Sequence, residues 1–413
     1  MMQRGVSIFG WVAGGVVGAL SGGMVVALWA LSATILSGHP TVIPLGAALW
    51  SGAIVGLVVG AFRRGRTTPA AVALGVGGLM GFAWWALNSG RPIGLERPDL
   101  FWGFFGSLAS FALVGHLTRY ALRDLDLSQP RRDTVEHLLL RLLRAVGFVF
   151  FGTTVTFPFY FMLASSLKSR AEMLLDPTNL SIQFSKGLPE LLEGYVEVLY
   201  TFNFWRYILN STFVASVTVV VTLVLGVLGA YAVTRLRFPG KELMSRSILL
   251  IYMFPAIVLV VPLYAVFTQL GLRDTLPGLL IVYPATTLPV ALYMLRSYFQ
   301  TLPAELEEAG LIDGCSRIEV IWRITLPLSV PALASVGLYV FMIAWNEFLF
   351  AFMFLDTPEL FTLSRGMVAL NTQEVPRQFL MAGAVIVTVP VMVLFFWFER
   401  YLIGGLTAGG VKG

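Results

Sequence analysis

The sequence predicts an all-α fold in which a bundle of helices crosses a membrane many times. Of the 413 residues, 57% are hydrophobic and 12% are charged, and the mean hydropathy is +0.80. An ordinary soluble domain has roughly 25% charged residues. The apolar residues also occur in blocks of about 20, long enough for a helix to cross roughly 30 Å of hydrocarbon. We therefore expect the lipid bilayer to surround most of the chain.

Composition and spacing argue against several other classes of protein. The formal net charge is +5, but the basic residues lie in short clusters between apolar blocks. That pattern is typical of cytoplasmic loops and not of a nucleic-acid-binding surface. The single cysteine, Cys315, has no partner for an internal disulfide, and His39, His116 and His137 lack the spacing of a metal site. We expect no nucleic acid partner and no metal.

Ten apolar blocks predict ten membrane-spanning helices. The first is longer than a signal-peptide core and has no convincing cleavage site, so we expect it to be retained. When the chain is threaded back and forth, the arginine-rich loops fall on one side, which the positive-inside rule makes cytoplasmic. Both termini are then cytoplasmic. The predicted spans are 8–33, 45–62, 70–88, 100–119, 145–165, 208–233, 246–269, 277–297, 331–354 and 380–402.

The chain divides into parts of different composition. Residues 1–122 form four glycine-rich helices, residues 123–144 form a charged linker, and residues 145–413 hold six further helices. In the first part, glycines recur at a spacing of four residues, which places them along one helix face. With no charged or polar ladder beside them, we interpret these faces as packing surfaces and not as a pore lining. The glycines are Gly14, Gly18 and Gly22, and Gly52, Gly56 and Gly60.

Prolines interrupt the apolar blocks of the second part. Each removes a backbone donor and bends its helix, which suits a gated pathway. Proline is also common in transmembrane helices in general, so the pattern does not by itself identify a pathway. The prolines are Pro158, Pro255, Pro262, Pro284, Pro289 and Pro390.

The segment between the eighth and ninth predicted spans has helical signals of its own. Pro303 suits the first turn of a helix, and Gly314 is well placed to end it. Ser316 and Glu319 have the spacing of a capping box that starts a second helix, which runs to Pro327 and leads into the ninth span. We therefore predict a helix-turn-helix on the cytoplasmic face.

The residues of this segment resemble the coupling motif of ABC importer permeases. That motif is written as EAA, three residues, G, nine residues and I-x-L-P. Here it reads Glu308-Ala309-Gly310, three residues, Gly314, nine residues and Ile324-Thr325-Leu326-Pro327. The departure is Gly310, where the pattern has its second alanine. Glycine loosens the helix by up to about 1 kcal/mol, and we expect it to make room for a partner.

Other segments resemble the carbohydrate-uptake permeases of the maltose-transporter type, and among them the smaller, six-helix subunit. The resemblance covers residues 140–413 and implies a type I ABC importer permease core of six helices, with four extra helices ahead of it. The segments that carry it are 204–207, 210–211, 231–241, 344–348 and 405–413.

The resemblance implies a bacterial inner-membrane importer with several partners. They are a second permease subunit, a dimer of ATPase subunits and an extracytoplasmic sugar-binding protein. The sequence contains no G-x-x-x-x-G-K-[ST] phosphate loop, so ATP and Mg are expected on the partner subunits. We expect this chain to be no enzyme and to bind no cofactor.

By the same resemblance, the coupling helix, residues 302–316, docks in a cleft of the ATPase. Small residues there admit close approach, and Glu308 offers a charge to a donor. From the residues alone, an exposed first-turn glutamate and turn glycines would explain the pattern equally well. The expected coupling residues are Glu308, Ala309, Gly310, Asp313, Gly314, Ile324, Leu326 and Pro327.

The C-terminal tail, residues 404–413, is rich in glycine. The resemblance implies that it inserts between the ATPase subunits, and the alternative is a frayed terminus. The expected docking residues are Leu406, Thr407, Gly409, Gly410 and Lys412.

Two further contact regions are expected. Asn346 and Glu347 form a polar pair within a predicted span, which favours a role in the pathway or in contact with the other permease. The loop 166–206, with Phe202, Phe204 and Trp205 near its end, is the expected surface for the sugar-binding protein.

Two alternatives remain open from the sequence. A secondary transporter would also suit ten helices with proline breaks, but it predicts two similar halves and charged residues at mid-membrane. An ABC permease could instead carry another polar solute such as glycerol phosphate. The resemblance favours maltose, maltodextrin or trehalose-type oligosaccharides.

Overall fold

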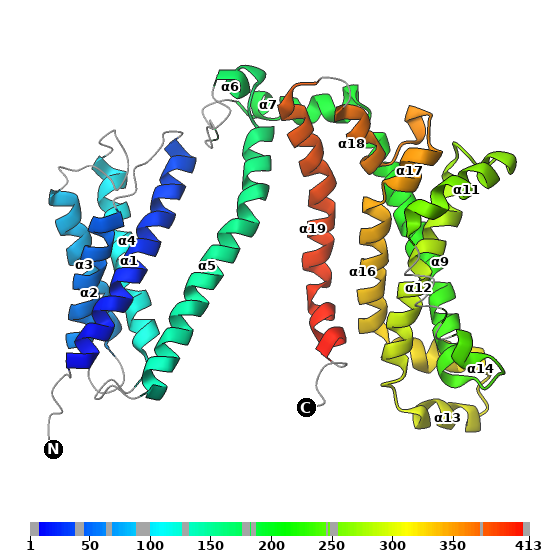
Figure 1. The fold of residues 1–413 in the computed structure, drawn as a ribbon, viewed down its shortest axis with the longest axis horizontal. Helices are drawn as coiled ribbons and strands as arrows, with labels where there is room; N and C mark the ends of the chain where they lie inside the picture. Colours follow the sequence, from blue (N-terminus) through cyan, green and yellow to red (C-terminus); the bar gives the residue numbers. More distant parts are fainter. Residues whose placement is uncertain are drawn as a thin grey trace. The chain divides into compact units, whose positions relative to one another are not determined.

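Every regular element in the described part of the chain is a helix (Figure 1). The computed structural model describes residues 8–37, 45–62, 68–87, 100–125, 132–175, 182, 187–244, 247, 255–371 and 375–407. By its internal contacts the chain forms two compact units, Met1–Gly187 and Leu188–Gly413.

The first unit is built from two pairs of helices followed by a long one. Helix α1 packs along α2, and α3 packs along α4. Their shared core contains Val26, Val55, Val59 and Phe111, all fully buried. The helices are α1 (Ile8–Ser37), α2 (Leu45–Ala61), α3 (Ala70–Leu87), α4 (Leu100–Leu122), α5 (Arg132–Ser166) and α6 (Arg170–Leu175).

Glycines bring the backbones of α1 and α2 into contact. A Cβ added to Gly18 would lie 2.2 Å from the carbonyl oxygen of Gly52, and one added to Gly56 would lie 2.0 Å from that of Gly14. Between α3 and α4, a Cβ on Gly77 would lie 2.1 Å from the Phe111 oxygen. The predicted packing role of the glycine faces on α1 and α2 is confirmed, because a Cβ at these positions would collide with the backbone of the other helix.

The second unit is a bundle in which α9 packs against α12 and α16, and α16 packs against α19. One core cluster contains Tyr283, Trp345 and Phe354, and another contains Phe299 and Tyr231. The elements are α7 (Leu188–Leu191), α8 (Glu193–Val196), η1 (Glu197–Thr201), α9 (Phe204–Arg235), α11 (Ala256–Gln269), α12 (Leu276–Phe299), α13 (Ala304–Ile312), α14 (Arg317–Val320), η2 (Ile321–Thr325), α15 (Leu326–Leu328), α16 (Val330–Asn346), α17 (Leu349–Phe354), η3 (Pro358–Leu360), α18 (Leu363–Asn371) and α19 (Arg377–Thr407).

Several helices have the length and composition of membrane spans. Among the described residues, five qualify outright: Ile8–Ser32, Arg132–Ser166, Phe204–Arg235, Leu276–Phe299 and Arg377–Arg400. The bent pair Arg317–Leu328 and Val330–Asn346 is a further candidate, and Leu45–Ala61, Ala70–Ala86 and Ile257–Gln269 are shorter apolar helices. The predicted all-α polytopic fold is confirmed.

The boundaries differ most from prediction in two places. Helix α5 begins at Arg132, so much of the predicted charged linker is helical. The ninth predicted span is broken, because α16 ends at Asn346 and α17 begins at Leu349. Part of the seventh predicted span lies outside the described residues. Helix α5 belongs by contacts to the first unit, so the six-helix core from residue 145 stays a prediction.

Candidate functional site

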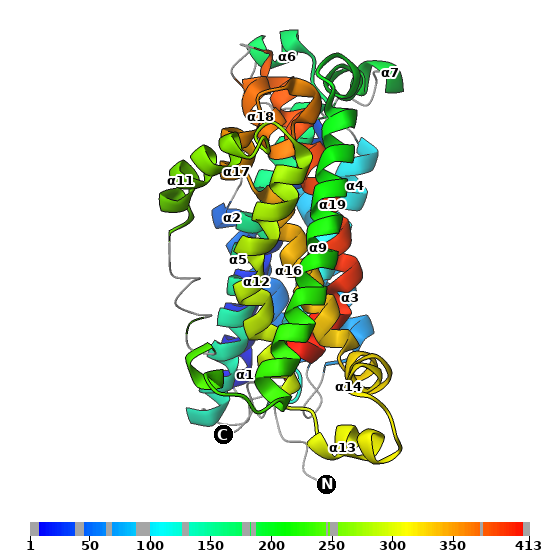
Figure 2. The same cartoon turned by 90° about the vertical axis from the view of Figure 1, so that its right-hand side faces the viewer.

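The segment between α12 and α16 folds as two short helical arms joined by a tight turn. Gly314 takes a φ of +87°, a conformation that favours glycine. Its N–H donates to the Leu311 oxygen at 3.1 Å, and the Cys315 N–H donates to the Gly310 oxygen at 3.0 Å, which ends α13. Figure 2 shows α13 and α14 at one end of the unit. The predicted helix-turn-helix is confirmed.

A capping box starts the second arm. The Ser316 N–H donates to Glu319 Oε2 at 2.8 Å, and the Glu319 N–H donates to Ser316 Oγ at 3.3 Å. The Ser316 backbone bond, its hydroxyl and then Arg323 lower the pKa of Glu319 below its ordinary value. The backbone N–H groups of Ser316 and Glu319, which have no partner within the helix, are therefore both hydrogen-bonded, as the sequence predicts.

The inner face of the first arm is held to the bundle by a buried glutamate. Glu307 is 5% exposed, and its Oε2 lies 3.1 Å from Nε of Arg235 at the end of α9. Its Oε1 accepts a hydrogen bond from the Thr325 hydroxyl at 3.2 Å. Arg235 Nη2 also donates to the oxygens of Phe299 at 3.0 Å and Leu302 at 2.9 Å. One ion pair therefore joins α9, the end of α12 and both arms.

Gly310 lies where the two arms meet. A Cβ placed on it would come within 2.5 Å of Ile324 Cδ1. The space left by the missing side chain is therefore filled by Ile324 of the same chain. This corrects the expectation that glycine at this position makes room for a partner.

The outer face of the segment is open and partly apolar. Ile312 is 85% exposed, Ile318 is 77% exposed and Trp322 is 73% exposed. Glu308, Ala309, Asp313, Gly314 and Pro327 are exposed as well, whereas Leu326 is partly buried. The sequence interpretation did not single out these three apolar residues. Their signal was large apolar side chains in a segment outside the predicted spans.

The second arm turns sharply into α16. The axes of Arg317–Leu328 and Val330–Asn346 meet at 83°. Ser329 is buried at this bend, and its main-chain oxygen accepts a hydrogen bond from the Leu333 N–H at 2.8 Å. The Tyr298 hydroxyl of α12 donates to the Leu328 oxygen at 3.1 Å. The second arm and α16 therefore meet at a hydrogen-bonded corner.

Glu347 caps α17 from within the chain. Its carboxylate accepts the N–H groups of Phe350 at 2.9 Å and Ala351 at 3.2 Å, and the Ser364 hydroxyl donates to its main-chain oxygen at 2.7 Å. Asn346 is exposed and donates to the Met342 oxygen at 2.9 Å. A pathway or partner role for this pair stays a prediction.

The aromatic residues around the start of α9 do not form one surface. Phe204 is 1% exposed and packs on Tyr207 with ring centroids 5.3 Å apart. Phe202 packs on Phe379, whereas Trp205 is about half exposed. The expectation that Phe204 contacts the sugar-binding protein is wrong, because its ring fills the core of the unit.

The C-terminal tail is helical for longer than predicted. Helix α19 continues through Leu406 to Thr407. Gly409, Gly410 and Lys412 lie outside the described residues, so the predicted tail contacts stay a prediction.

Comparison with known proteins agrees with this geometry. Residues 222–407 match the family described as binding-protein-dependent transport system inner membrane component. The chain is 43% identical over 271 residues to the inner membrane ABC transporter permease protein YcjP of Escherichia coli, covering 95% of that protein and 65% of this chain. The chain belongs to this family of ABC importer permeases. It is thus a transport component and a multi-pass membrane protein, and the secondary-transporter alternative is excluded.

Two further similarities support the resemblance to the maltose-transporter type. The permease is 38% identical over 282 residues to the trehalose/maltose transport system permease protein MalG of Thermococcus litoralis, covering 99% of that protein and 67% of this chain. A crystal structure of a bacterial ABC transporter involved in the import of the polysaccharide alginate aligns with a TM-score of 0.55 and 25% identity, over 99% of its own chain and 66% of this one. About a third of this permease lies outside each of these matches.

Proposed function

We propose that this permease forms half of the translocation pathway of an ATP-driven sugar importer and couples ATP hydrolysis by partner subunits to alternating access. The observation that carries the proposal is that the inner and outer faces of the coupling segment make different contacts. Its inner face is held to the bundle by Glu307 and Arg235, whereas its outer face presents Ile312, Ile318 and Trp322 to a partner. Large apolar side chains exposed in a segment outside the predicted membrane spans mark an interaction surface.

The partner that fits this surface is an ATPase subunit. A cleft on the ATPase would bury the apolar side chains, while Glu308 meets a basic group or a backbone donor. When the ATPase dimer closes, the segment moves as a rigid body. The Arg235–Glu307 pair passes that motion to α9, and the 83° corner passes it to α16. Two packed arrangements of the bundle then alternate.

The remaining partners follow from family membership and the chain's open surfaces. A second permease completes the pathway. A binding protein docks within residues 166–206, where Trp205 at the start of α9 is about half exposed. The tail residues Leu406 to Lys412 lie between the ATPase subunits, where ATP and Mg bind. Both termini face the cytoplasm, as the arginine-rich loops favour.

The cargo we propose is an oligosaccharide of the maltose, maltodextrin or trehalose type. The relative MalG is named for trehalose and maltose transport, and the aligned crystal structure is of a transporter involved in alginate import. Uptake by the reconstituted importer should therefore be seen with labelled maltose or trehalose. Uptake of labelled glycerol 3-phosphate in place of both sugars would reject this cargo.

The coupling role is tested by ATPase activity of the complete complex in lipid with sugar-loaded binding protein. Glu308→Arg combined with Gly314→Trp alters the exposed face and the turn, and it should abolish stimulation while the complex still assembles. The control is Glu136→Arg, which changes another exposed glutamate, on α5 of the other unit. The proposed coupling would be overturned if ATPase activity were fully stimulated in the double variant. It would also be overturned if no ATPase subunit co-purified with the wild-type permease.

A further inference from the structure

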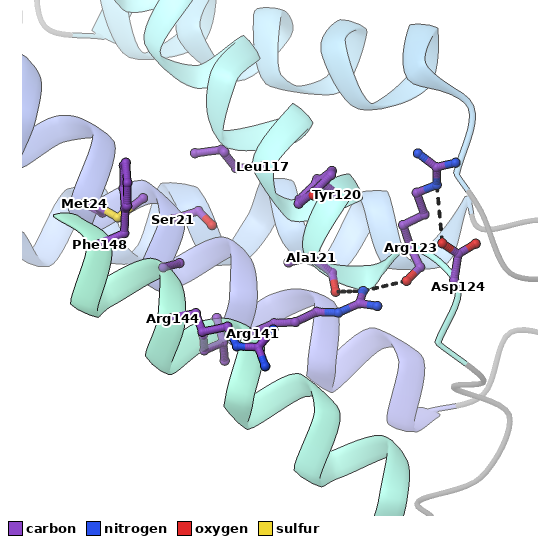
Figure 3. A pocket seen from close by; sticks show the side chains of 12 residues that line it. Ser21, Met24, Leu117, Tyr120, Ala121, Arg123, Asp124, Arg141, Arg144 and Phe148 are labelled. Carbon is purple, nitrogen blue, oxygen red and sulfur yellow. Dashed lines mark hydrogen bonds and ion pairs between the residues drawn. The ribbon is translucent and has the colours of Figure 1, made fainter. Parts of the chain in front are cut away.

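The first unit holds a cavity of about 580 Å³ between α1, α4 and α5 (Figure 3). Its lining residues precede the match to the family model, which begins at residue 222, although its α5 residues fall within the longer match to MalG. Arg123 and Asp124 lie at one end of the cavity, Met24 and Phe148 lie at the other, and Arg141 and Arg144 lie between them. The cavity is therefore charged at one end and apolar at the other.

The charged part has an excess of positive charge. Three arginines and one aspartate line it, which gives a formal charge of +2. Arg123 pairs with Asp124 at 3.4 Å, and both side chains are more than half exposed. Arg141 uses one nitrogen, Nη1, to donate to the oxygens of Ala121 at 3.0 Å and Arg123 at 2.6 Å. Arg144 is exposed and has no hydrogen bond or ion pair with any described residue.

The arginines of the cavity lie next to the ends of two apolar runs. Arg141 and Arg144 come directly before the apolar run of α5, and Arg123 comes directly after that of α4. The arginines therefore lie where an apolar span meets water, while Met24, Leu117 and Phe148 lie on the side of the hydrocarbon. Tyr120, which lines the cavity and is exposed, suits the same boundary.

We propose that this cavity binds an anionic phospholipid. The guanidinium groups of Arg144 and Arg123, with the unused nitrogens of Arg141, would hold the phosphate, because arginine donors match phosphate oxygens in pairs. An acyl chain would lie along Met24, Leu117 and Phe148. A basic pocket between transmembrane helices is the arrangement that selects anionic headgroups. A free phosphate would use the arginines alone and leave the apolar end uncovered.

The test is native mass spectrometry of the full chain purified with its partner subunits. The probes are phosphatidylglycerol, phosphatidylcholine with the same acyl chains, and inorganic phosphate. Wild type should retain phosphatidylglycerol in preference to phosphatidylcholine. Arg144→Gln should lower that retention about fivefold, the effect of one arginine at a membrane surface, and adding Arg123→Gln should lower it further. The fold should survive, because both side chains are exposed.

The matched control is Arg237→Gln, which removes an exposed arginine from the second unit and should leave lipid retention unchanged. Phe148→Ser should weaken phosphatidylglycerol retention without changing the binding of phosphate. The proposal would be overturned by equal retention of the two lipids or by unchanged retention in the Arg123 and Arg144 double variant. Displacement of the lipid by millimolar phosphate, or a protein bound in the cavity in place of lipid, would overturn it as well. None of these readouts depends on ATP coupling or sugar uptake.

Discussion

Arg235 at the end of α9 and Glu307 in α13 are 72 residues apart in the sequence and form a buried ion pair, with Nε and Oε2 3.1 Å apart. Their side chains are 15% and 6% exposed. Water therefore screens the pair little, and each charge depends on the other. The same two side chains also bind Thr325 and the end of α12. The coupling segment is in this way fixed to the bundle at its inner face.

Removing one member of this pair should be strongly destabilising. Arg235→Met leaves Glu307 buried without its counter-charge, which costs about 3–5 kcal/mol. Combining Arg235→Met with Glu307→Leu should recover part of this loss, because no unpaired charge is then buried. Thermal unfolding of the purified complex measures both effects, and binding-protein-stimulated ATPase activity should fall in each variant. Glu305→Gln, an exposed position on the same helix, is the control. A single Arg235→Met that unfolds like Glu305→Gln would contradict the buried pair.

Gly310 should tolerate alanine but not valine. The contact that a new Cβ would make is with the far end of the Ile324 side chain, which can turn away. Alanine also favours the helix by about 1 kcal/mol over glycine, so Gly310→Ala should be close to neutral. Gly310→Val overpacks the junction and should cost about 1–3 kcal/mol. Ile324→Ala should relieve the valine variant in a double-mutant cycle. Additive losses in that cycle would show that residues 310 and 324 do not share the junction.

A glycine-to-alanine substitution at the contact between α1 and α2 should be more destabilising than the one at Gly310. A Cβ at Gly18 would meet a backbone oxygen at 2.2 Å, and backbone cannot turn away as a side chain can. Gly18→Ala should therefore lower the stability of the first unit by about 1–3 kcal/mol, as overpacking does. Gly46→Ala on α2 is the matched control, because nothing lies within 4 Å of its added Cβ. Limited proteolysis of the purified chain in lipid compares them, and equal rates for the two variants would argue against backbone contact at Gly18.

The sequence predicts the helices well wherever one signal dominates. Residues 277–297 were expected and α12 spans Leu276–Phe299, because a long apolar run in lipid has to satisfy its backbone groups within a helix. The ninth span fails as one helix since Glu347 turns back to cap α17, a local hydrogen bond that hydropathy does not register. The π-helical stretch Ile321–Thr325 likewise has no periodic signature.

The sequence predicts the turn and the capping box of the candidate site, but it does not predict which residues face the bundle and which are exposed. Gly314 and the Ser316–Glu319 box follow from local chemistry, and both are present. Glu307 and Glu308 are identical neighbours in sequence, yet only Glu307 is buried. The contact that separates them is with Arg235 on a distant helix. No local pattern encodes that contact, so the sequence interpretation chose Glu308 from the motif and gave Glu307 only a favourable place in the first turn of the helix.

Asp274 ties the turn before α12 to the segment after α17, and this tie should weaken in acid. Its carboxylate accepts the N–H groups of Asp356 and Thr357, each at 2.9 Å, and the Thr357 hydroxyl at 2.5 Å. Partial burial raises the pKa of Asp274, but the Thr357 and Asp356 hydrogen bonds and the nearby Arg273 outweigh it, so its pKa lies below the ordinary 3.8.

A pKa that is lower in the folded state means that the stabilisation is complete above the unfolded pKa of about 3.9. It is lost as the pH falls through the folded value. Hydrogen exchange at the Asp356 and Thr357 amides should accordingly show protection that is constant from neutral pH to about 4, after correction for the intrinsic exchange rate, and that falls below it. In the Asp274→Asn variant, the protection of these amides should be lower at neutral pH and should lose most of its dependence on acid. The control variant Asp133→Asn changes an exposed site on α5 and should behave as wild type. Protection that rises as the pH falls below 4 would mean that the neutral acid, and not the carboxylate, holds the two segments together.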